Sequence, residues 1–523
     1  METTGVNTVV TELSKQTIRS YIDQHASNIG DRTFLIAPDS GHTQDFSSLK
    51  TSADSIGAKL DALGISRGAK IAFLINNGFW TVQLFLGVMA SNRIIVPLNA
   101  VAGTAQLQHV LGHSDAEVVF VSEDYRDNLK EIMAGVDRQI RVITTDPVEG
   151  PDWPVTTDDQ AVSAPAPTND DPALLLYTSG STGLPKGAVL SHLAVTTGGA
   201  NVAGGHNLSK QDRALCVLPV YHINGAMVTV SAPLVSGSSV VMPDRFRAST
   251  FWKLVAEYQC TWSSVVPTII KYLLDRADQE TFNFGSDERL SCFRFGRSAS
   301  APLPAVVLQQ WEDTFQVPMI ETIGLTETAG TVATNPLPPA VRKNGSVGVA
   351  FGNEIIVLDE NNIECAANTP GELVIRGDNV LKQYYKNPEA TAAAFTGDWF
   401  RTGDLGKKDD EGYLYITGRL KELIIRGGEN IAPREIDDVL YKHESILEAA
   451  AVGVDDENYG QEVVACVVIR DGYSCTEQEL KSFCEAAVGK YKTPKTIYFM
   501  DDLPKGPSGK ILRLKLPAII SAL

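Results

Sequence analysis

Short apolar runs alternate with amphipathic stretches through the first two thirds of the chain, and this alternation is the strongest constraint on the fold. Residues 69–75 and 93–99 are apolar runs of strand length, and residues 78–91 between them have the length and composition of a helix. Residues 116–122 and 138–145 continue the series as strands. Strands that alternate with helices form parallel sheets with helices on their faces. The sequence therefore predicts an α/β fold with stacked sheets.

The pattern changes after about residue 340. Three short runs broken by Gly, Asp and Asn are typical of a small antiparallel β unit: 352–362, 371–378 and 412–419. A helix over 434–446, a strand and loop over 448–456, a strand over 462–470 and a helix over 476–488 capped by Thr476 are then expected. We place a domain boundary after residue 419. Residues 1–419 then form a large N-terminal domain with the small β subdomain, and residues 420–523 form a smaller, mobile α+β lid.

Charge and composition exclude several functions. The 523 residues carry a formal net charge of −18, which disfavours nucleic acid as a partner because that binding depends on neutralising phosphates. The sequence contains no run of 18 apolar residues, so no membrane span is expected. The first ten residues lack the features of a secretion signal. Seven cysteines without a C-x-x-C pair fit a reducing compartment, so we expect a cytoplasmic protein. The oligomeric state cannot be inferred from these features.

The stretch LLLYTSGSTGLPKGAV, residues 174–189, combines an apolar strand end with a loop rich in Gly, Ser and Thr and then Lys186. Glycines expose backbone N–H groups, and such a loop can surround a polyphosphate. The common P-loop G-x-x-x-x-G-K-[S/T] does not match, because Gly187 and Ala188 follow the lysine. A Ser/Gly-rich surface turn is the structural alternative.

The motif YTSGSTGLPKG (177–187) resembles the signature of the adenylate-forming superfamily, which includes acyl-CoA synthetases, luciferase and the adenylation domains of peptide synthetases. Five further segments resemble that family in the family's order: GLTET (324–328), GELVIRG (371–377), WFRTGDLG (399–406), GRLKELIIRGGENIAPREID (418–437) and LPKGPSGKI (503–511). The resemblance spans nearly the whole chain. It implies a two-step reaction in which a carboxylic acid and ATP give acyl-AMP and pyrophosphate, and a thiol, usually that of CoA, then accepts the acyl group.

The resemblance also implies roles for individual residues, with ATP, Mg²⁺ and CoA as cofactors. Glu327 and Thr182 would hold Mg²⁺, and Thr326 would contact the α-phosphate. Lys510 would bridge the carboxylate and the α-phosphate. Asp404 would accept hydrogen bonds from both ribose hydroxyls, and Arg419 would reach the ribose or a phosphate. The remaining ATP-binding residues implied are Thr178, Ser179, Gly180, Ser181, Gly183, Lys186, Ser298, Ala299, Ser300, Thr322 and Ile323.

The thiol step implies that the lid turns. Lys421 occupies the family's hinge position, and a rotation there would replace Lys510 by the segment that contains Gly427, Gly428 and Glu429. Two glycines without side chains would let a pantetheine arm pass close to the backbone.

One departure concerns the nucleotide base. The family usually has an aromatic residue before the Gly of GLTE, where adenine stacks, and this chain has Ile323. Isoleucine can pack on a ring face without aromatic stacking, so adenine binding is expected to differ.

The acyl pocket is expected to be lined by His222, Asn224, Met227, Arg297 and Gly324, and His222 is also a candidate catalytic residue. Arg297 either pairs with an acidic neighbour at a strand end or points inward and binds a second carboxylate. The segments TWSSVVPTII (261–270) and FRFGRSASAPL (293–303) resemble oxalyl-CoA synthetases, which implies oxalate or another small polar acid.

Other functions stay open at this point. The acid is also open to a fatty acid or an aryl acid, and the acceptor to a carrier-protein phosphopantetheine. A luciferase-type oxidoreductase and a catalytically silent binding protein are further readings. Lys510, Glu327 and Asp404 are all retained, which argues against a silent protein.

Overall fold

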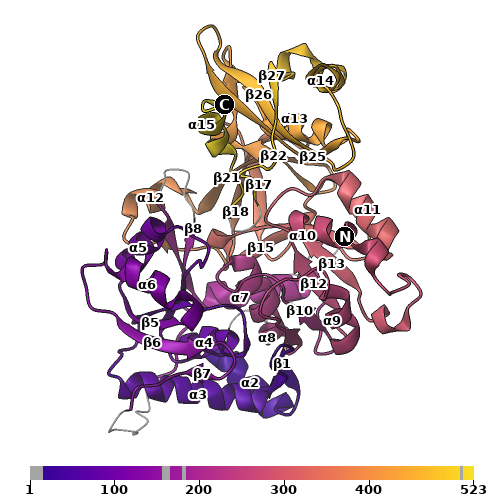
Figure 1. Ribbon diagram of the computed structural model, residues 1–523. Helices are drawn as coiled ribbons and strands as arrows, with labels where there is room; N and C mark the ends of the chain where they lie inside the picture. Colours follow the sequence, from indigo (N-terminus) through magenta and orange to yellow (C-terminus); the bar gives the residue numbers. More distant parts are fainter. Residues whose placement is uncertain (1–15, 156–164, 179–183, 507–509) are drawn as a thin grey trace.

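The computed structural model describes residues 16–155, 165–178, 184–506 and 510–523. Two large sheets with helices between and around them form most of the molecule, and a smaller unit lies at one end beyond β17, β18, β21 and β22 (Figure 1). This arrangement confirms the predicted α/β fold with a small β subdomain and an α+β C-terminal unit. No described helix has both the length and the apolarity to cross a bilayer.

The first sheet continues the alternation seen in the sequence. Its inner strands β4, β3, β5 and β6 run parallel, as predicted, and most residues of β3, β4 and β5 are buried and apolar. Its order is β19 (Gln383–Tyr384), β9 (Lys186–Ser191), β8 (Pro172–Thr178), β4 (Ile94–Pro97), β3 (Lys70–Leu74), β5 (Ala116–Val121), β6 (Arg141–Asp146) and β7 (Gly150–Pro151).

The second sheet combines early and late parts of the N-terminal region. The early strand β1 pairs with β2 on one side and with β11, about two hundred residues later in the chain, on the other. Parallel pairing connects β1, β11, β10, β12, β13 and β14. Its order is β16 (Val349–Ala350), β15 (Gly330–Thr334), β14 (Met319–Leu325), β13 (Phe295–Ser298), β12 (Trp262–Val265), β10 (Arg213–Leu215), β11 (Ser239–Val241), β1 (Thr33–Ala37) and β2 (His42–Asp45).

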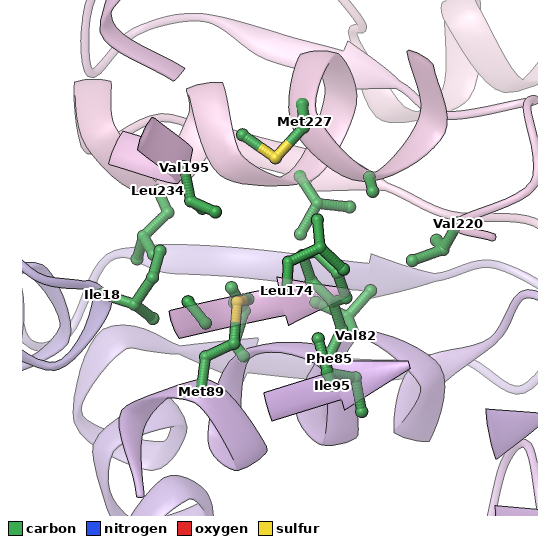
Figure 2. Close-up of a cluster of buried hydrophobic side chains, with 14 of the residues drawn as sticks. Ile18, Val82, Phe85, Met89, Ile95, Leu174, Val195, Val220, Met227 and Leu234 are labelled. Carbon is green, nitrogen blue, oxygen red and sulfur yellow. The ribbon is translucent and has the colours of Figure 1, made fainter. Parts of the chain in front are cut away.

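Helices pack between and outside these sheets. Figure 2 shows the core between them, where Phe85 and Met89 of α4 face Val195 of α7 and Met227. Burial of such side chains stabilises each by about 1.5–3 kcal/mol. The N-terminal helices are α2 (Ile18–Ile29), α3 (Phe46–Ala62), α4 (Phe79–Ala90), α5 (Thr104–His113), α6 (Arg126–Met133), α7 (His192–Gly205), α8 (Ala232–Ser236), α9 (Phe251–Tyr258), α10 (Pro267–Leu274), α11 (Ala305–Phe315) and α12 (Pro388–Ala393).

The small β subdomain is antiparallel, as predicted. Its strands are β17 (Glu354–Leu358), β18 (Gly371–Arg376), β20 (Phe395–Thr396), β21 (Trp399–Lys408) and β22 (Leu414–Arg419). The C-terminal unit follows, with β23 (Ile424–Arg426), β24 (Glu429–Ile431), α13 (Pro433–Leu440), β25 (Ile446–Asp456), β26 (Gly460–Ile469), α14 (Glu477–Lys492), β27 (Thr496–Phe499) and α15 (Leu516–Ile520).

Two predicted elements of the C-terminal unit change at their ends. The helix expected over 434–446 ends at Leu440, and residues 441–445 turn so that the buried Ile446 can start β25. The loop expected at the end of 448–456 is strand, because β25 pairs with β26 as far as Asp456. Thr476 caps α14 as predicted, since its side chain accepts a hydrogen bond from the Glu479 backbone N–H. Nothing in the structure tests the boundary after residue 419, which stays a prediction.

His206 gives a testable acid sensitivity to this core. Its ring is fully buried, edge-on to Phe295 at 5.1 Å, and both ring nitrogens lack a hydrogen-bond partner among the described residues. Burial lowers the pKa of His206 to about 3. In the unfolded chain the His206 side chain has an ordinary pKa of about 6.5. Between pH 6.5 and pH 3 it therefore binds a proton in the unfolded state that it does not bind in the folded state. Stability is full above pH 6.5 and falls as the pH drops from 6.5 toward 3.

Replacing His206 with Phe should remove this part of the acid sensitivity. Between pH 7 and pH 5, the wild-type protein should lose about 2 kcal/mol more unfolding free energy than His206→Phe. Urea unfolding curves at the two pH values measure the difference. Equal losses in both proteins would show that His206 is not excluded from protonation in the fold.

Candidate active site

Two adjoining cavities lie between the large sheets, the β subdomain and the C-terminal unit. The large cavity has a volume of about 1290 Å³ and the small cavity about 290 Å³. Ser300, Gly324 and Arg419 line both, so the two spaces meet at the carboxyl ends of β13 and β14. Ligands of open α/β sheets bind at this edge.

The ends of the glycine-rich loop reach the large cavity. Thr178 closes β8 and pairs with Lys186 at the start of the antiparallel β9. Both residues line the large cavity. The Lys186 ammonium lies 4.4 Å from the centre of the Tyr384 ring. The predicted residues Ser179, Gly180, Ser181, Thr182 and Gly183 lie outside the described part of the chain.

A tight turn after β14 presents Thr326 and Glu327 to the same cavity. It requires a glycine at 324, since a Cβ there would lie 2.1 Å from the Gly330 carbonyl oxygen. One oxygen of the Glu327 carboxylate accepts a hydrogen bond from the Tyr384 hydroxyl at 2.9 Å, which leaves the other oxygen to a ligand. No group of three His, Cys, Asp or Glu side chains in the described residues forms a metal cage. Magnesium bound through one or two carboxylates and substrate phosphates fits this arrangement.

The small cavity contains a charge cluster around the buried Asp404. Asp404 of β21 pairs with Arg419 of the neighbouring β22, with Arg419 Nε 2.7 Å from an Asp404 oxygen. Lys510 enters the same cavity from the C-terminal unit. Burial raises the pKa of Asp404, and the Arg419 and Lys510 cations oppose that rise. Burial and Arg419 lower the pKa of Lys510, while Glu422 and Asp404 act in the opposite direction. The cluster therefore holds two partly exposed cations beside a buried carboxylate.

Polar side chains at the other wall of the small cavity lack partners. The Ser298 and Thr322 hydroxyl oxygens are buried and have no hydrogen-bond partner among the described residues. Ser300 has φ +72°, a left-handed backbone that costs a non-glycine residue energy and often marks a functional site. Ile323 lines this wall too, and Ala299 is buried beside it. Unpaired buried donors of this kind fit a nucleotide with several acceptors.

Two polar side chains line the large cavity together with apolar ones such as Leu218, Val266 and Ile269. His222 and Asn224 line it at the start of a π-helix, η2 (Asn224–Ser231), an element that is rare and often found at functional sites. Burial lowers the pKa of His222 to about 4, so its ring is neutral at pH 7. Its Nε2 atom is buried without a partner among the described residues. A neutral imidazole that faces the cavity can donate or accept one hydrogen bond there.

Arg297 lies directly behind Asn224. It is 2% exposed, and it donates to the Asn224 amide oxygen at 3.1 Å, to Ser264 Oγ at 2.8 Å and to Thr331 Oγ1 at 2.7 Å. Burial lowers the pKa of Arg297 to about 9. No described acidic side chain pairs with it, so the reading of an Arg–acid pair is wrong. The alternative, that Arg297 points into the acyl pocket and binds a second carboxylate, also needs a correction. Arg297 lines neither cavity, and it is connected to the large one by its hydrogen bond to Asn224.

Met227, the predicted CoA-binding segment and the predicted hinge have different relations to the cavities. Met227 is fully buried in the core between the sheets (Figure 2) and lines neither cavity, because the π-helix turns it away from Asn224. Gly427, Gly428 and Glu429 lie outside both cavities, on the β23–β24 turn. Lys421, the predicted hinge, lies in the short η6 helix (Leu420–Glu422) and lines the large cavity.

Tyr384 was missed by sequence reasoning. The signal was available as two adjacent tyrosines in the polar stretch 381–388, but nothing in the sequence indicates that β19 pairs with β9, which brings Tyr384 beside Lys186.

Two features together define an adenylate-forming enzyme: a fold of two α/β sheets with a C-terminal unit, and two adjoining cavities of which one is lined by Thr178 and Lys186 and the other by Lys510. The chain belongs to the AMP-binding enzyme family: the family model for the AMP-binding enzyme matches residues 22–385, and that for its C-terminal domain matches residues 435–510. It is an acyl-CoA synthetase, an AMP-forming acid–thiol ligase, and the predicted cofactors ATP, Mg²⁺ and CoA are those of such ligases.

Named relatives support this assignment. The chain is 45% identical to a sulfoacetate–CoA ligase of Cupriavidus necator over 96% of this chain and 97% of that protein. It is 36% identical to an oxalate–CoA ligase of Arabidopsis thaliana over 86% of this chain and 88% of that one. ATP-bound MatB of Rhodopseudomonas palustris superposes with a TM-score of 0.85 at 28% identity, covering 96% of this chain and 100% of that one.

Proposed function

We propose that this acyl-CoA synthetase activates a short acid that carries a second anionic group, with sulfoacetate as the first candidate and oxalate as the second. The observation behind the proposal is that Asn224 and His222 line the large cavity. Arg297 is buried behind Asn224, donates a hydrogen bond to its amide oxygen and has no acidic partner among the described residues. A buried cation without an anionic partner is costly, and a bound sulfonate or carboxylate would offset that cost.

Relatives favour sulfoacetate over oxalate, because the sulfoacetate–CoA ligase is 45% identical and the oxalate–CoA ligase 36% identical to this chain. The sequence resemblance to oxalyl-CoA synthetases thus extends to a wider class of small dianions. A fatty chain or an aryl ring would leave the His222 Nε2 atom, which has no partner among the described residues, unpaired against an apolar surface. Leaving such a group unpaired costs about 1–3 kcal/mol.

In the first half-reaction, residues of this chain would bind the ATP phosphates and offset the repulsion between the acid carboxylate and the α-phosphate. Lys186 and Thr178 would bind the outer phosphates, and Thr326 would donate to the α-phosphate. Lys510 would lie between the acid carboxylate and the α-phosphate, where it offsets the repulsion of two anions. The paired Asp404 and Arg419 would orient the ribose. Glu327 would hold magnesium, which would neutralise charge on the phosphates.

The thiol step would need another arrangement of the lid. Lys510 is in the small cavity, whereas Gly427, Gly428 and Glu429 lie outside both cavities. We propose that a rotation at Lys421 exchanges them, which would let pantetheine enter beside the two glycines. CoA is the proposed acceptor.

A pyrophosphate-release screen with mass detection of the acyl-CoA tests the proposed function. Sulfoacetate and oxalate should give the highest kcat/KM, ahead of malonate, acetate, octanoate and benzoate. A clear preference for octanoate or benzoate would refute the dianion proposal. Hydroxylamine trapping with and without CoA tests the acceptor: acyl hydroxamate that forms equally without CoA, together with no detectable acyl-CoA, would instead support a carrier-protein acceptor.

A further inference from the structure

Tyr384 contacts two predicted members of the phosphate site at once. Its hydroxyl donates to Glu327 Oε1 at 2.9 Å, and its ring lies under the Lys186 ammonium at 4.4 Å. The side chain is only 5% exposed, yet it lines the large cavity. One residue therefore connects the carboxylate proposed for the metal with the lysine proposed for the phosphates.

The chain around Tyr384 also fixes the backbone of the Glu327 turn. Leu381 donates its backbone N–H to the Glu327 carbonyl oxygen at 2.7 Å, and Asn379 Nδ2 donates to the Thr328 carbonyl oxygen at 2.7 Å. With the Tyr384 hydroxyl, three hydrogen bonds connect residues 379–384 to one short turn. The turn is thus held by its backbone, and its carboxylate is oriented separately by Tyr384.

The hydroxyl is suited to this task. An ionised carboxylate only accepts hydrogen bonds, so the Tyr384 hydroxyl, 2.9 Å from Glu327 Oε1, is the donor in this contact. A donor fixed on one carboxylate oxygen leaves the lone pairs of the other for a cation. Such outer hydrogen bonds orient metal ligands, and their loss weakens metal affinity by about 10–100-fold.

We propose that Tyr384 is a positioning residue that sets the Glu327 carboxylate for the metal and the Lys186 ammonium for the phosphates. The inference rests on the proposed metal-binding role of Glu327. It assigns two separable contributions to one side chain: the hydroxyl acts on the metal, and the ring acts on the lysine through a cation–π contact.

Two substitutions separate these contributions. Tyr384→Phe removes the hydroxyl and keeps the ring, whereas Tyr384→Leu removes both. The neighbouring Tyr385→Phe is the matched control, because its hydroxyl donates to Asp115 at 2.7 Å and it does not line either cavity. Thermal unfolding checks that each variant is folded.

Binding of Mn²⁺ in the presence of α,β-methylene-ATP, followed by the electron paramagnetic resonance signal of free Mn²⁺, measures the metal contribution without turnover. Tyr384→Phe should raise the Mn²⁺ dissociation constant by about 10–100-fold, and Tyr385→Phe should leave it unchanged. In the Glu327→Gln background, Tyr384→Phe should have no further effect. Calorimetry with the ATP analogue should show a further loss of about 2- to 30-fold for Tyr384→Leu relative to Tyr384→Phe.

The outcomes distinguish this inference from the role on which it rests. If Glu327→Gln weakens Mn²⁺ binding and Tyr384→Phe does not, the positioning role of Tyr384 is wrong and the metal role of Glu327 stands. If Glu327→Gln has no effect on Mn²⁺ binding, the metal role is wrong and the inference falls with it. If Tyr384→Phe weakens Mn²⁺ binding equally in the wild-type and Glu327→Gln backgrounds, the hydroxyl does not act through Glu327.

Discussion

Replacing Lys510 with alanine is expected to lower the rate of acyl-adenylate formation by about 100- to 1000-fold, the usual effect of removing a group that stabilises transition-state charge. Lys510 lies in the small cavity with Asp404 and Arg419. Its ammonium would offset the repulsion between the acid carboxylate and the α-phosphate. Thioester formation from pre-made acyl-AMP should change much less, because the lid is proposed to withdraw Lys510 for that step. Pyrophosphate exchange and acyl-CoA formation from synthetic acyl-AMP measure the two half-reactions separately.

Lys505→Ala is the matched control for this prediction. Lys505 lies on the same C-terminal segment but pairs with Glu448 at 2.8 Å and lines neither cavity. It should leave adenylation close to the wild-type rate. A Lys510→Ala protein that is folded by circular dichroism and loses both half-reactions equally would contradict a role confined to the first step.

Replacing Arg297 with methionine is expected to reduce kcat/KM for a dianionic acid by about a hundredfold. Arg297 does not contact the cavity, so its effect is electrostatic and is relayed by Asn224. A unit charge about 6 Å from a substrate anion, at an effective dielectric constant of about 20, contributes roughly 3 kcal/mol, which corresponds to about a hundredfold in rate. The substitution also removes one of the two donors on the Asn224 amide oxygen, which keeps its hydrogen bond from Ser264 Oγ at 2.7 Å. Steady-state kinetics with sulfoacetate and with acetate measure the change.

The ratio of the two acids separates specificity from general damage. Acetate lacks the second anionic group, so its kcat/KM should change little, and the KM for ATP should stay near the wild-type value. Arg294→Met is the control, because Arg294 is close in sequence, pairs with Asp212 at 3.0 Å and lines neither cavity. An equal loss with both acids would mean that Arg297 supports the fold and does not select the substrate.

Asn224 and Arg297 show which part of this site the sequence could not predict. The sequence places both as polar residues near the acyl pocket, but it does not indicate which of the two lines the cavity and which lies behind the other. Asn224 faces the space because a π-helix begins there, and Arg297 lies behind it because β13 points its side chain toward Ser264 and Thr331. The direction of a strand side chain depends on register with β12 and β14, which is a long-range property.

The sequence by itself determined the alternating strands and helices, the antiparallel β subdomain and the residues of the adenylation motifs, because periodicity and local motifs need only nearby residues. Tertiary structure alone decided that Met227 packs in the core, that Arg297 acts behind Asn224 and that Tyr384 joins Lys186 to Glu327. The physical reason is the distance along the chain. Tyr384 reaches Lys186 only because β19 pairs with β9 across almost two hundred residues, and no local pattern encodes such a pairing.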